Sequence, residues 1–138
     1  MDEAEARARL AGARVARLGT HGPGGRIDLV PITFAVADDG TIVHAVDHKP
    51  KSTTRLRRLA NVAADPRVTV LVDHWDEDWT ALWWVRVHGT ATVVEPGDHG
   101  HAPAVDALVA RYPQYCEQRP AGPAVVITPE RWTGWAGR

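Results

Sequence analysis

Residues 26–64 read RIDLVPITFAVADDGTIVHAVDHKPKSTTRLRRLANVAA, and this stretch decides the fold. Two runs rich in β-prone residues, 26–37 and 41–47, flank a turn signal at residues 38–40, which predicts an antiparallel hairpin. Over residues 52–64 apolar side chains recur at helical spacing, so a helix with one apolar face is expected there. A hairpin that runs directly into an amphipathic helix is therefore the centre of the predicted fold.

The rest of the chain extends this pattern in both directions. Asp2 is expected to cap a first helix, with Glu5 placed as in a capping box. Further strands are expected over residues 14–20, 68–75, 82–94 and 124–128, and another helix between a cap at Asp98 and a stop at Pro113. About six strands with short connections favour a mainly β fold with flanking helices, a six-stranded antiparallel barrel that is closed or nearly closed. A two-layer α+β sandwich is the alternative.

Length and composition bound the remaining possibilities. The chain has 138 residues, of which 44% are hydrophobic, and this predicts a single domain over residues 1–138. The lone cysteine, Cys116, excludes an internal disulfide framework and a zinc ribbon, and it favours a cytoplasmic location. Residues 1–12 lack the apolar segment of a signal peptide, and no long apolar run follows, so we expect no membrane insertion.

Charge and histidine placement argue against two classes of function. The 16 Lys and Arg residues are balanced by 17 Asp and Glu residues, so we expect no nucleic-acid partner, and any anion site must be local. His44 and His48 lie roughly 13 Å apart along an extended strand, too far to share one ion. His99 and His101 have no third ligand nearby in the sequence, so no metal site is expected.

A candidate anion site lies at residues 48–55, HKPKSTTR, where a strand ends and a helix begins. A helix N-terminus offers unpaired N–H groups and a partial positive charge. Lys49 and Lys51 converge on this point with the hydroxyls of Ser52 and Thr53. The alternative is that Ser52 or Thr53 only caps the helix and that both lysines are solvated.

Pro31 marks a second candidate region in the run 26–37. Proline cannot donate to a β-ladder, so it indicates a sheet edge or a bulge where neighbouring backbone groups are free to meet a ligand. A flat heterocycle would fit against such an edge; the alternative is an edge proline that only discourages aggregation. Alternation places Val30, Ile32 and Phe34 together on the opposite face from Pro31 and Thr33.

The aromatic residues are unusually biased toward tryptophan. There are six tryptophans, against one Phe and two Tyr. They are Trp75, Trp79, Trp83, Trp84, Trp132 and Trp135. Adjacent Trp83 and Trp84 must face opposite sides of a strand, and a subunit interface or a ring-binding pocket would account for the excess of tryptophan.

The sequence contains no nucleophile elbow, Rossmann fingerprint or P-loop, and no catalytic acid or base is identified.

The stretch 48–94, HKPKSTTRLRRLANVAADPRVTVLVDHWDEDWTALWWVRVHGTATVV, resembles the F420-dependent members of the pyridoxamine 5′-phosphate oxidase-like (PPOX-class) flavin/deazaflavin split-barrel superfamily. The likeness covers nearly the whole chain. It includes LVPITFAV at 29–36, DDGTIVHAVD at 38–47, DPRV at 65–68 and TPERWTGW at 128–135. The order and spacing of these segments, rather than any single one, carry the resemblance.

The resemblance implies a split-barrel homodimer with two cofactor sites in clefts between the subunits. It implies that the cofactor's phosphate is held at Lys49, Lys51, Ser52 and Thr53. It implies that the ring system lies against Val30, Pro31, Ile32 and Thr33. Aromatic groups of the partner subunit that close the cleft correspond to Trp79, Trp84 and Trp135.

The activity implied is that of a coenzyme F420-dependent oxidoreductase, which transfers a hydride between F420 and a small organic acceptor. The Lys-Pro-Lys-Ser-Thr run and the pair Trp83-Trp84 look closer to the deazaflavin group than to the FMN oxidases. Because one barrel hosts several chemistries, two alternatives stay open. They are an FMN-dependent pyridoxamine-phosphate-oxidase-like enzyme and a non-catalytic F420 or flavin carrier.

Overall fold

The computed structural model describes residues 1–46 and 53–138, with side chains for all of these except 53–56. In chain order its elements are α1 (Glu3–Gly12), β1 (Ala16–His21), η1 (Pro23–Gly25), β2 (Ile27–Ile32), β3 (Ala35–Val36), β4 (Ile42–Ala45), α2 (Thr53–Ala64), β5 (Arg67–His74), η2 (Trp79–Ala81), β6 (Trp83–Val94), α3 (His101–Arg111), α4 (Pro113–Glu117) and β7 (Ala124–Ala136). Among these described residues, no helix is both long and apolar enough to cross a membrane.

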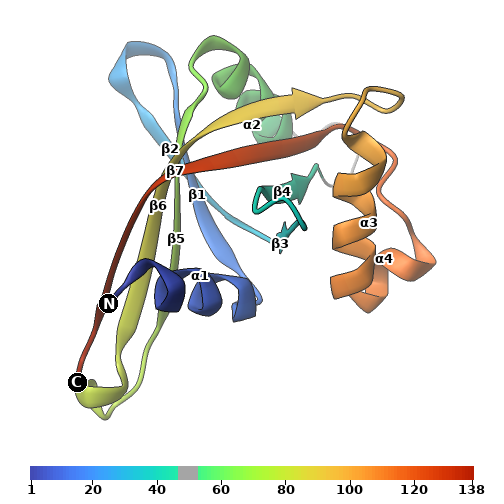
Figure 1. The fold of residues 1–138 in the computed structure, drawn as a ribbon. Helices are drawn as coiled ribbons and strands as arrows, with labels where there is room; N and C mark the ends of the chain where they lie inside the picture. The colour runs from blue at the N-terminus through green and yellow to red at the C-terminus, as the bar shows by residue number, and fades with distance from the viewer. Residues whose placement is uncertain (47–52) are drawn as a thin grey trace.

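Within the described residues the strands form one seven-stranded antiparallel sheet in the order β2-β1-β5-β6-β7-β4-β3. In Figure 1, β6 and β7 run together from near the C-terminus and then swing across the molecule toward α3, which curls the sheet into a half-barrel. The expected split-barrel architecture is confirmed. The strand number is seven rather than six because the run expected as one strand over residues 26–37 breaks into β2 and β3.

The break between β2 and β3 is held by side chains from distant elements. The Tyr112 hydroxyl accepts from the Phe34 N–H at 3.1 Å and lies 2.8 Å from the Phe34 carbonyl oxygen. The Tyr115 hydroxyl lies 2.9 Å from Thr33 Oγ1, and His44 Nδ1 lies 3.1 Å from the Thr33 carbonyl oxygen. Tyr112 and His44 thus satisfy backbone groups that leave the ladder, and Tyr115 holds the Thr33 side chain, so the direction in which the edge strand turns is fixed.

Element ends confirm some expectations and correct others. Asp2 caps α1, accepting from the Glu5 N–H at 2.8 Å, as expected. The expectation that Asp98 caps the next helix is wrong: its carboxylate accepts instead from the Glu95 N–H, and α3 begins after Gly100. Pro113 opens the short helix α4, where its missing N–H costs nothing.

The last strand is much longer than expected, since β7 continues past residue 128 to Ala136. A register shift between His88 and Gly89 lies where β6 meets Pro129 of β7. Proline lacks a donor, and a bulge lets the ladder resume on the far side of it. Trp132 and Trp135 are therefore strand residues, not part of an irregular tail.

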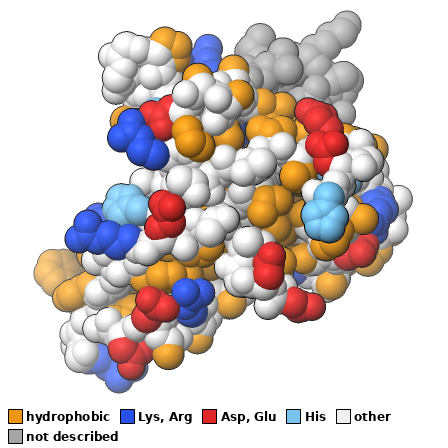
Figure 2. Space-filling model, turned by 45° about the horizontal axis from the view of Figure 1, so that its top comes forward, with side chains coloured by type: hydrophobic (Ala, Val, Ile, Leu, Met, Phe, Trp, Pro, Cys, Tyr) orange, Lys and Arg blue, Asp and Glu red, His pale blue; other side chains and the backbone are white. Residues whose placement is uncertain are grey.

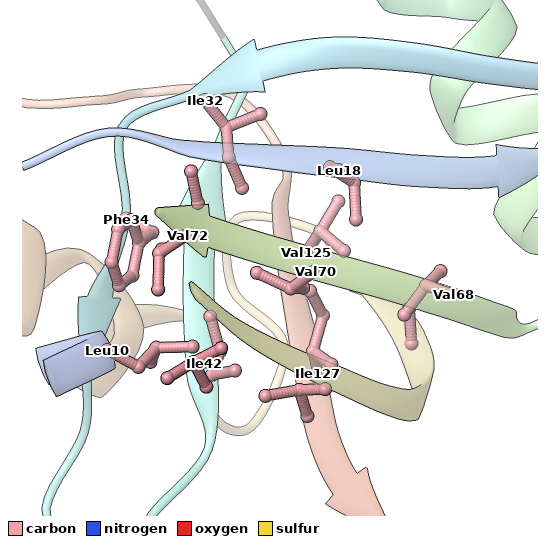
Figure 3. Close-up of a cluster of buried hydrophobic side chains, with 14 of the residues drawn as sticks. Leu10, Leu18, Ile32, Phe34, Ile42, Val68, Val70, Val72, Val125 and Ile127 are labelled. Atoms are coloured by element: carbon pink, nitrogen blue, oxygen red, sulfur yellow. The ribbon is translucent and has the colours of Figure 1, made fainter. Parts of the chain in front are cut away.

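Alternate strand residues build the main core on the inner face of the sheet. Leu18, Val70, Val85 and their neighbours are fully buried there. Helix α1 covers this cluster with Leu10, which reaches toward Ile42 in Figure 3. A second cluster forms where α3 packs on β3 and β4. It contains Ala35, Val43, Ala45, Ala104, Leu108 and Ala124.

The outer face of the sheet carries a continuous row of register partners. The row runs Pro31, Arg17, Leu71, Arg86 and Thr133 across β2, β1, β5, β6 and β7. These residues alternate with buried ones, so they point away from the core. On the same face of β2, the neighbouring aliphatic side chains are strongly exposed, at 53% for Ile27 and 72% for Leu29.

We expect Tyr112→Phe to lower the free energy of unfolding by about 1–3 kcal/mol, because the Phe34 N–H loses its partner beside a buried ring. Chemical denaturation measures the change. Tyr115→Phe is the matched control, since its hydroxyl meets the exposed Thr33 Oγ1, and it should cost less than about 1 kcal/mol. Equal losses in the two variants would contradict this account of the break.

Candidate functional site

A hollow of about 160 Å³ lies between the edge strand β2 and helix α2. Its lining residues are Thr20, Ile27, Asp28, Leu29, Val30, Arg57 and Arg58. The hollow therefore brings Val30, on the strand expected to meet a ring, beside the helix that begins at the expected anion site. Arg57 and Arg58 give its helical wall two permanent positive charges.

Asn61 fixes the distance between the two walls of this hollow, which we call the β2–α2 hollow. The side chain is 4% exposed, and its Nδ2 donates to Thr20 Oγ1 at 3.0 Å and to Asp28 Oδ2 at 2.7 Å. Arg26 also donates to Asp28, at 2.9 Å. Hydrogen bonding first from Arg26 and then from Asn61 lowers the pKa of Asp28. The carboxylate on the strand side is therefore ionised and already bound by two donors.

His44 links the break in the edge strand to Arg58. His44 is 5% exposed, with Nε2 at 2.5 Å from Arg58 Nη1 and Nδ1 at 3.1 Å from the Thr33 carbonyl oxygen. A guanidinium can only donate, so Nε2 must accept and the ring proton must lie on Nδ1, which donates to Thr33. Burial, followed by the charge of Arg58, lowers the pKa of His44 to about 4. The imidazole is therefore a neutral bridge at ordinary pH.

A second hollow, of about 400 Å³, lies at the far end of β5, β6 and β7. We call it the tryptophan hollow. Its lining residues are Leu71, Asp73, His74, Trp75, Leu82, Trp83, Trp84, Arg86 and Trp135. Trp84 and Trp135 are register partners on the outer face, and the Arg86 guanidinium lies 5.1 Å from the Trp84 ring centre. In one chain, β1 lies between the strands of this hollow and the edge strand β2.

The largest of these hollows, about 610 Å³, lies beside α3 and carries the wrong charge for an anionic ligand. Asp38, Asp39 and Asp106 line it. Elsewhere the charges are mixed: on the face shown in Figure 2, Lys and Arg side chains lie interspersed with Asp and Glu. The β2–α2 hollow, with its two arginines, is thus the better candidate for an anionic group. No group of three or more His, Cys, Asp or Glu residues in the described chain is arranged to hold a metal ion.

The family model described as pyridoxamine 5′-phosphate oxidase matches residues 2–136. The chain belongs to this family. A search of curated proteins gave no match.

Solved structures share the fold of this pyridoxamine 5′-phosphate oxidase family member over almost its whole length. A conserved hypothetical protein from Mycobacterium tuberculosis is 28% identical, with a TM-score of 0.79 and coverage of 100% of this chain and 86% of that one. A FAD-binding protein from Mesorhizobium loti is 22% identical, with a TM-score of 0.74 and coverage of 97% and 92%. The FAD-binding protein from Mycobacterium smegmatis is 20% identical, with a TM-score of 0.68 and coverage of 100% and 97%.

The residues expected to meet a ring lie at the sheet edge, as Pro31 indicated. β2 is an edge strand, and Pro31 is exposed on it. Val30 lines the β2–α2 hollow, and Thr33 is exposed at the break. The Ile32 side chain is 3% exposed in the core, so only its backbone is available to a ligand.

The other expected site residues divide into three groups. Lys49, Lys51 and Ser52 lie outside the described residues, and Thr53 is the first residue of α2. Trp84 and Trp135 come together in the tryptophan hollow, joined there by Trp75. Trp79 does not line that hollow; it opens η2 and is 68% exposed.

Sequence reasoning did not single out Arg58, His44 or Asn61 as parts of a site. The run RLRR at residues 55–58 is typical of a solvated basic helix face. His44 stands in an ordinary strand pattern, and Asn61 falls inside the helical period. Only His44 carried a signal: strand alternation places it on the same face as Ile42 and Val46, toward the interior, where a polar group needs a partner.

Proposed function

We propose that this protein is an F420-dependent oxidoreductase that transfers a hydride between coenzyme F420 and a small organic acceptor. The observation that carries the proposal is the β2–α2 hollow, where Val30 meets Arg57 and Arg58 in a chain of this family. A ring system and an anionic phosphate are the two parts of a flavin or deazaflavin that such a surface would bind. A cytoplasmic location, expected from the single cysteine, belongs to the same proposal.

The chemistry of the residues fits an anionic, ring-bearing cofactor. Guanidinium groups form strong, charge-assisted hydrogen bonds with phosphate oxygens, and they supply two of the donors on α2. Lys49, Lys51, Ser52 and Thr53, which precede or open that helix in the sequence, are proposed to complete the anion site. Val30, Pro31, Ile32 and Thr33 are proposed to meet the ring along the exposed edge of β2.

The size of the hollow supports a site shared by two chains. Pockets that enclose a drug-sized ligand usually measure about 300–1,000 Å³. One chain offers about 160 Å³ at this edge. We therefore propose a homodimer in which Trp79, Trp84 and Trp135 of the partner subunit close the cleft.

The exposed outer face of the sheet supports the same assembly. Ile27 and Leu29 lie on it, and Trp135 on the same face is 47% exposed. Large apolar side chains that are exposed together on one face of a sheet are typical of an interaction surface. A two-fold dimer would pair this face with itself, which is how most homodimers bury such a surface.

The protein's share of the reaction is binding, orientation and exclusion of water. Reduced F420, when bound, supplies a hydride, and the acceptor takes up that hydride together with a proton. The arginines of α2 would hold the anionic end, and the edge of β2 would set which ring atoms face the acceptor. The tryptophans of the partner subunit would exclude water from the cleft.

The choice of F420 over a flavin rests on the resemblance of residues 48–94, and above all on the Lys-Pro-Lys-Ser-Thr run. Two structures with this fold are named as FAD-binding proteins, which favours a flavin-type ring in general. An FMN-dependent oxidase is therefore the second candidate enzyme. Because those neighbours are named for binding alone, a non-catalytic F420 or flavin carrier is the third candidate.

With reduced F420 supplied, we expect the purified protein to reduce an unsaturated or quinone-like acceptor, and NADPH should not replace F420. The change in F420 absorbance follows turnover, and fluorescence competition between F420 and FMN identifies the preferred cofactor. Robust NADPH-driven turnover without F420 would contradict the proposal. Protein that purifies yellow with FMN indicates the oxidase, and tight binding without turnover of any acceptor indicates the carrier.

We expect Lys51→Ala to weaken F420 binding by about one to two decades, because charge-assisted hydrogen bonds are worth roughly 1.5–3 kcal/mol each. The melting temperature should change little, and binding to the parent protein should weaken as salt rises. Arg131→Ala removes an exposed charge from β7 and is the control. If Lys49→Ala and Lys51→Ala both bind F420 and FMN like the parent, the run only caps a helix.

We expect light scattering to show a dimer at micromolar concentration and Leu29→Glu to shift it toward monomer, since a buried charge opposes pairing of the outer faces. Ala110→Glu places the same charge on an exposed position of α3 and should leave the dimer intact. If the parent protein is a monomer, with or without cofactor, the proposed homodimer is wrong.

A further inference from the structure

We propose that His44 is a positioning residue, which holds the Arg58 guanidinium at the β2–α2 hollow for the anionic end of the cofactor. This inference rests on the proposed function, because it concerns the same site. The observation behind it is the chain of contacts from the Thr33 carbonyl, through the His44 imidazole, to Arg58 Nη1. Arg58 itself lines the hollow.

The bridge joins the two parts of the proposed site. Thr33 follows directly after β2, on the segment proposed to meet the ring, and Arg58 lies on the helix proposed to meet the phosphate. His44 stands between them on β4, which pairs with β7 at Val125. One buried imidazole therefore sets the position of an anion-binding group relative to the edge strand.

A neutral acceptor suits this task better than a carboxylate. Other arginines of the chain bind carboxylates directly; for example, Arg26 contacts Asp28 at 2.9 Å and Arg67 contacts Asp65 at 2.6 Å. A carboxylate fixes a guanidinium but also cancels its charge. An imidazole that accepts through Nε2 holds the guanidinium and adds no negative charge of its own.

The imidazole is itself well fixed. It is buried, its proton is held on Nδ1 by the Thr33 carbonyl, and burial beside Arg58 disfavours its charged form. An arginine side chain loses rotamer entropy when it is held in one orientation. Orienting the guanidinium before the ligand arrives moves that entropy loss from binding to folding.

Two substitutions separate the two hydrogen bonds of His44. In His44→Gln the amide oxygen can still accept from Arg58, because it reaches the position of Nε2. In His44→Asn the shorter amide can still donate to the Thr33 carbonyl, but it falls short of Arg58. We expect the Asn variant to bind F420 about tenfold more weakly than the parent and the Gln variant to stay within about threefold.

The order of the Arg58 guanidinium gives a readout that needs no cofactor. Nitrogen NMR should show slow guanidinium rotation in the parent and in His44→Gln, and faster rotation in His44→Asn. The parent imidazole should show its proton on Nδ1. In an Arg58→Met background, His44→Asn should have no further effect on F420 binding.

Equal F420 affinities for His44→Gln and His44→Asn, or unchanged guanidinium rotation in His44→Asn, would overturn the positioning role while leaving the proposed function standing. If the guanidinium behaves as expected but the parent binds neither F420 nor FMN, the proposed function fails, and with it the role of His44 toward a cofactor.

Should His44→Asn fail to fold, Arg58→Lys supplies the test. It keeps the charge but loses the fixed guanidinium fork. We expect binding about tenfold weaker in that variant, and parent-like affinity would count against the proposal.

Discussion

The structure depends on one constraint: the backbone that leaves the edge ladder at Thr33 and Phe34 must find hydrogen-bond partners elsewhere. Tyr112 supplies partners for Phe34, and His44 supplies one for Thr33. Tyr112 lies between α3 and α4, and His44 lies on β4, so satisfying the break also ties the helical pair and β4 to the end of the edge strand. The curled half-barrel and the exposed edge of β2 are thus two results of one local requirement.

That requirement also connects the core to the candidate site. His44 donates to the Thr33 carbonyl through Nδ1. Its Nε2 therefore carries no proton and can only accept from Arg58. Burial keeps the imidazole neutral, so no added positive charge lies beside the guanidinium. Asn61 acts in parallel on the other wall, where it binds Thr20 and Asp28 at once. The hollow between β2 and α2 is therefore positioned by buried polar residues rather than by its own exposed ones.

Local sequence patterns predicted the elements whose ends are determined locally. The Asp2 cap, the hairpin around residues 38–40 and the helix up to Ala64 follow from neighbouring residues, and the structure confirms them. The break after Ile32 and the long run of β7 could not be predicted in this way. The break depends on Tyr112, 78 residues away from Phe34, and the length of β7 depends on pairing with β6 that resumes beyond the register shift at Pro129. Both features depend on tertiary contacts, which the local periodicity of apolar residues does not reveal.

The same distinction, between features set by neighbouring residues and features set by tertiary contacts, explains which residues of the candidate site could be predicted from the sequence. Pro31 revealed the edge of the sheet because a missing N–H is a property of the residue itself. Arg58 and His44 carry no such mark, because the contact between them joins a helix to a strand and is set by the tertiary structure. Within one chain, the tryptophans do not reach the edge strand β2. Trp84 and Trp135 lie on β6 and β7, and β5 and β1 lie between them and β2. The proposed site uses both the edge of β2 and these rings, and this is why it is proposed between two chains: folding of one chain leaves these residues apart.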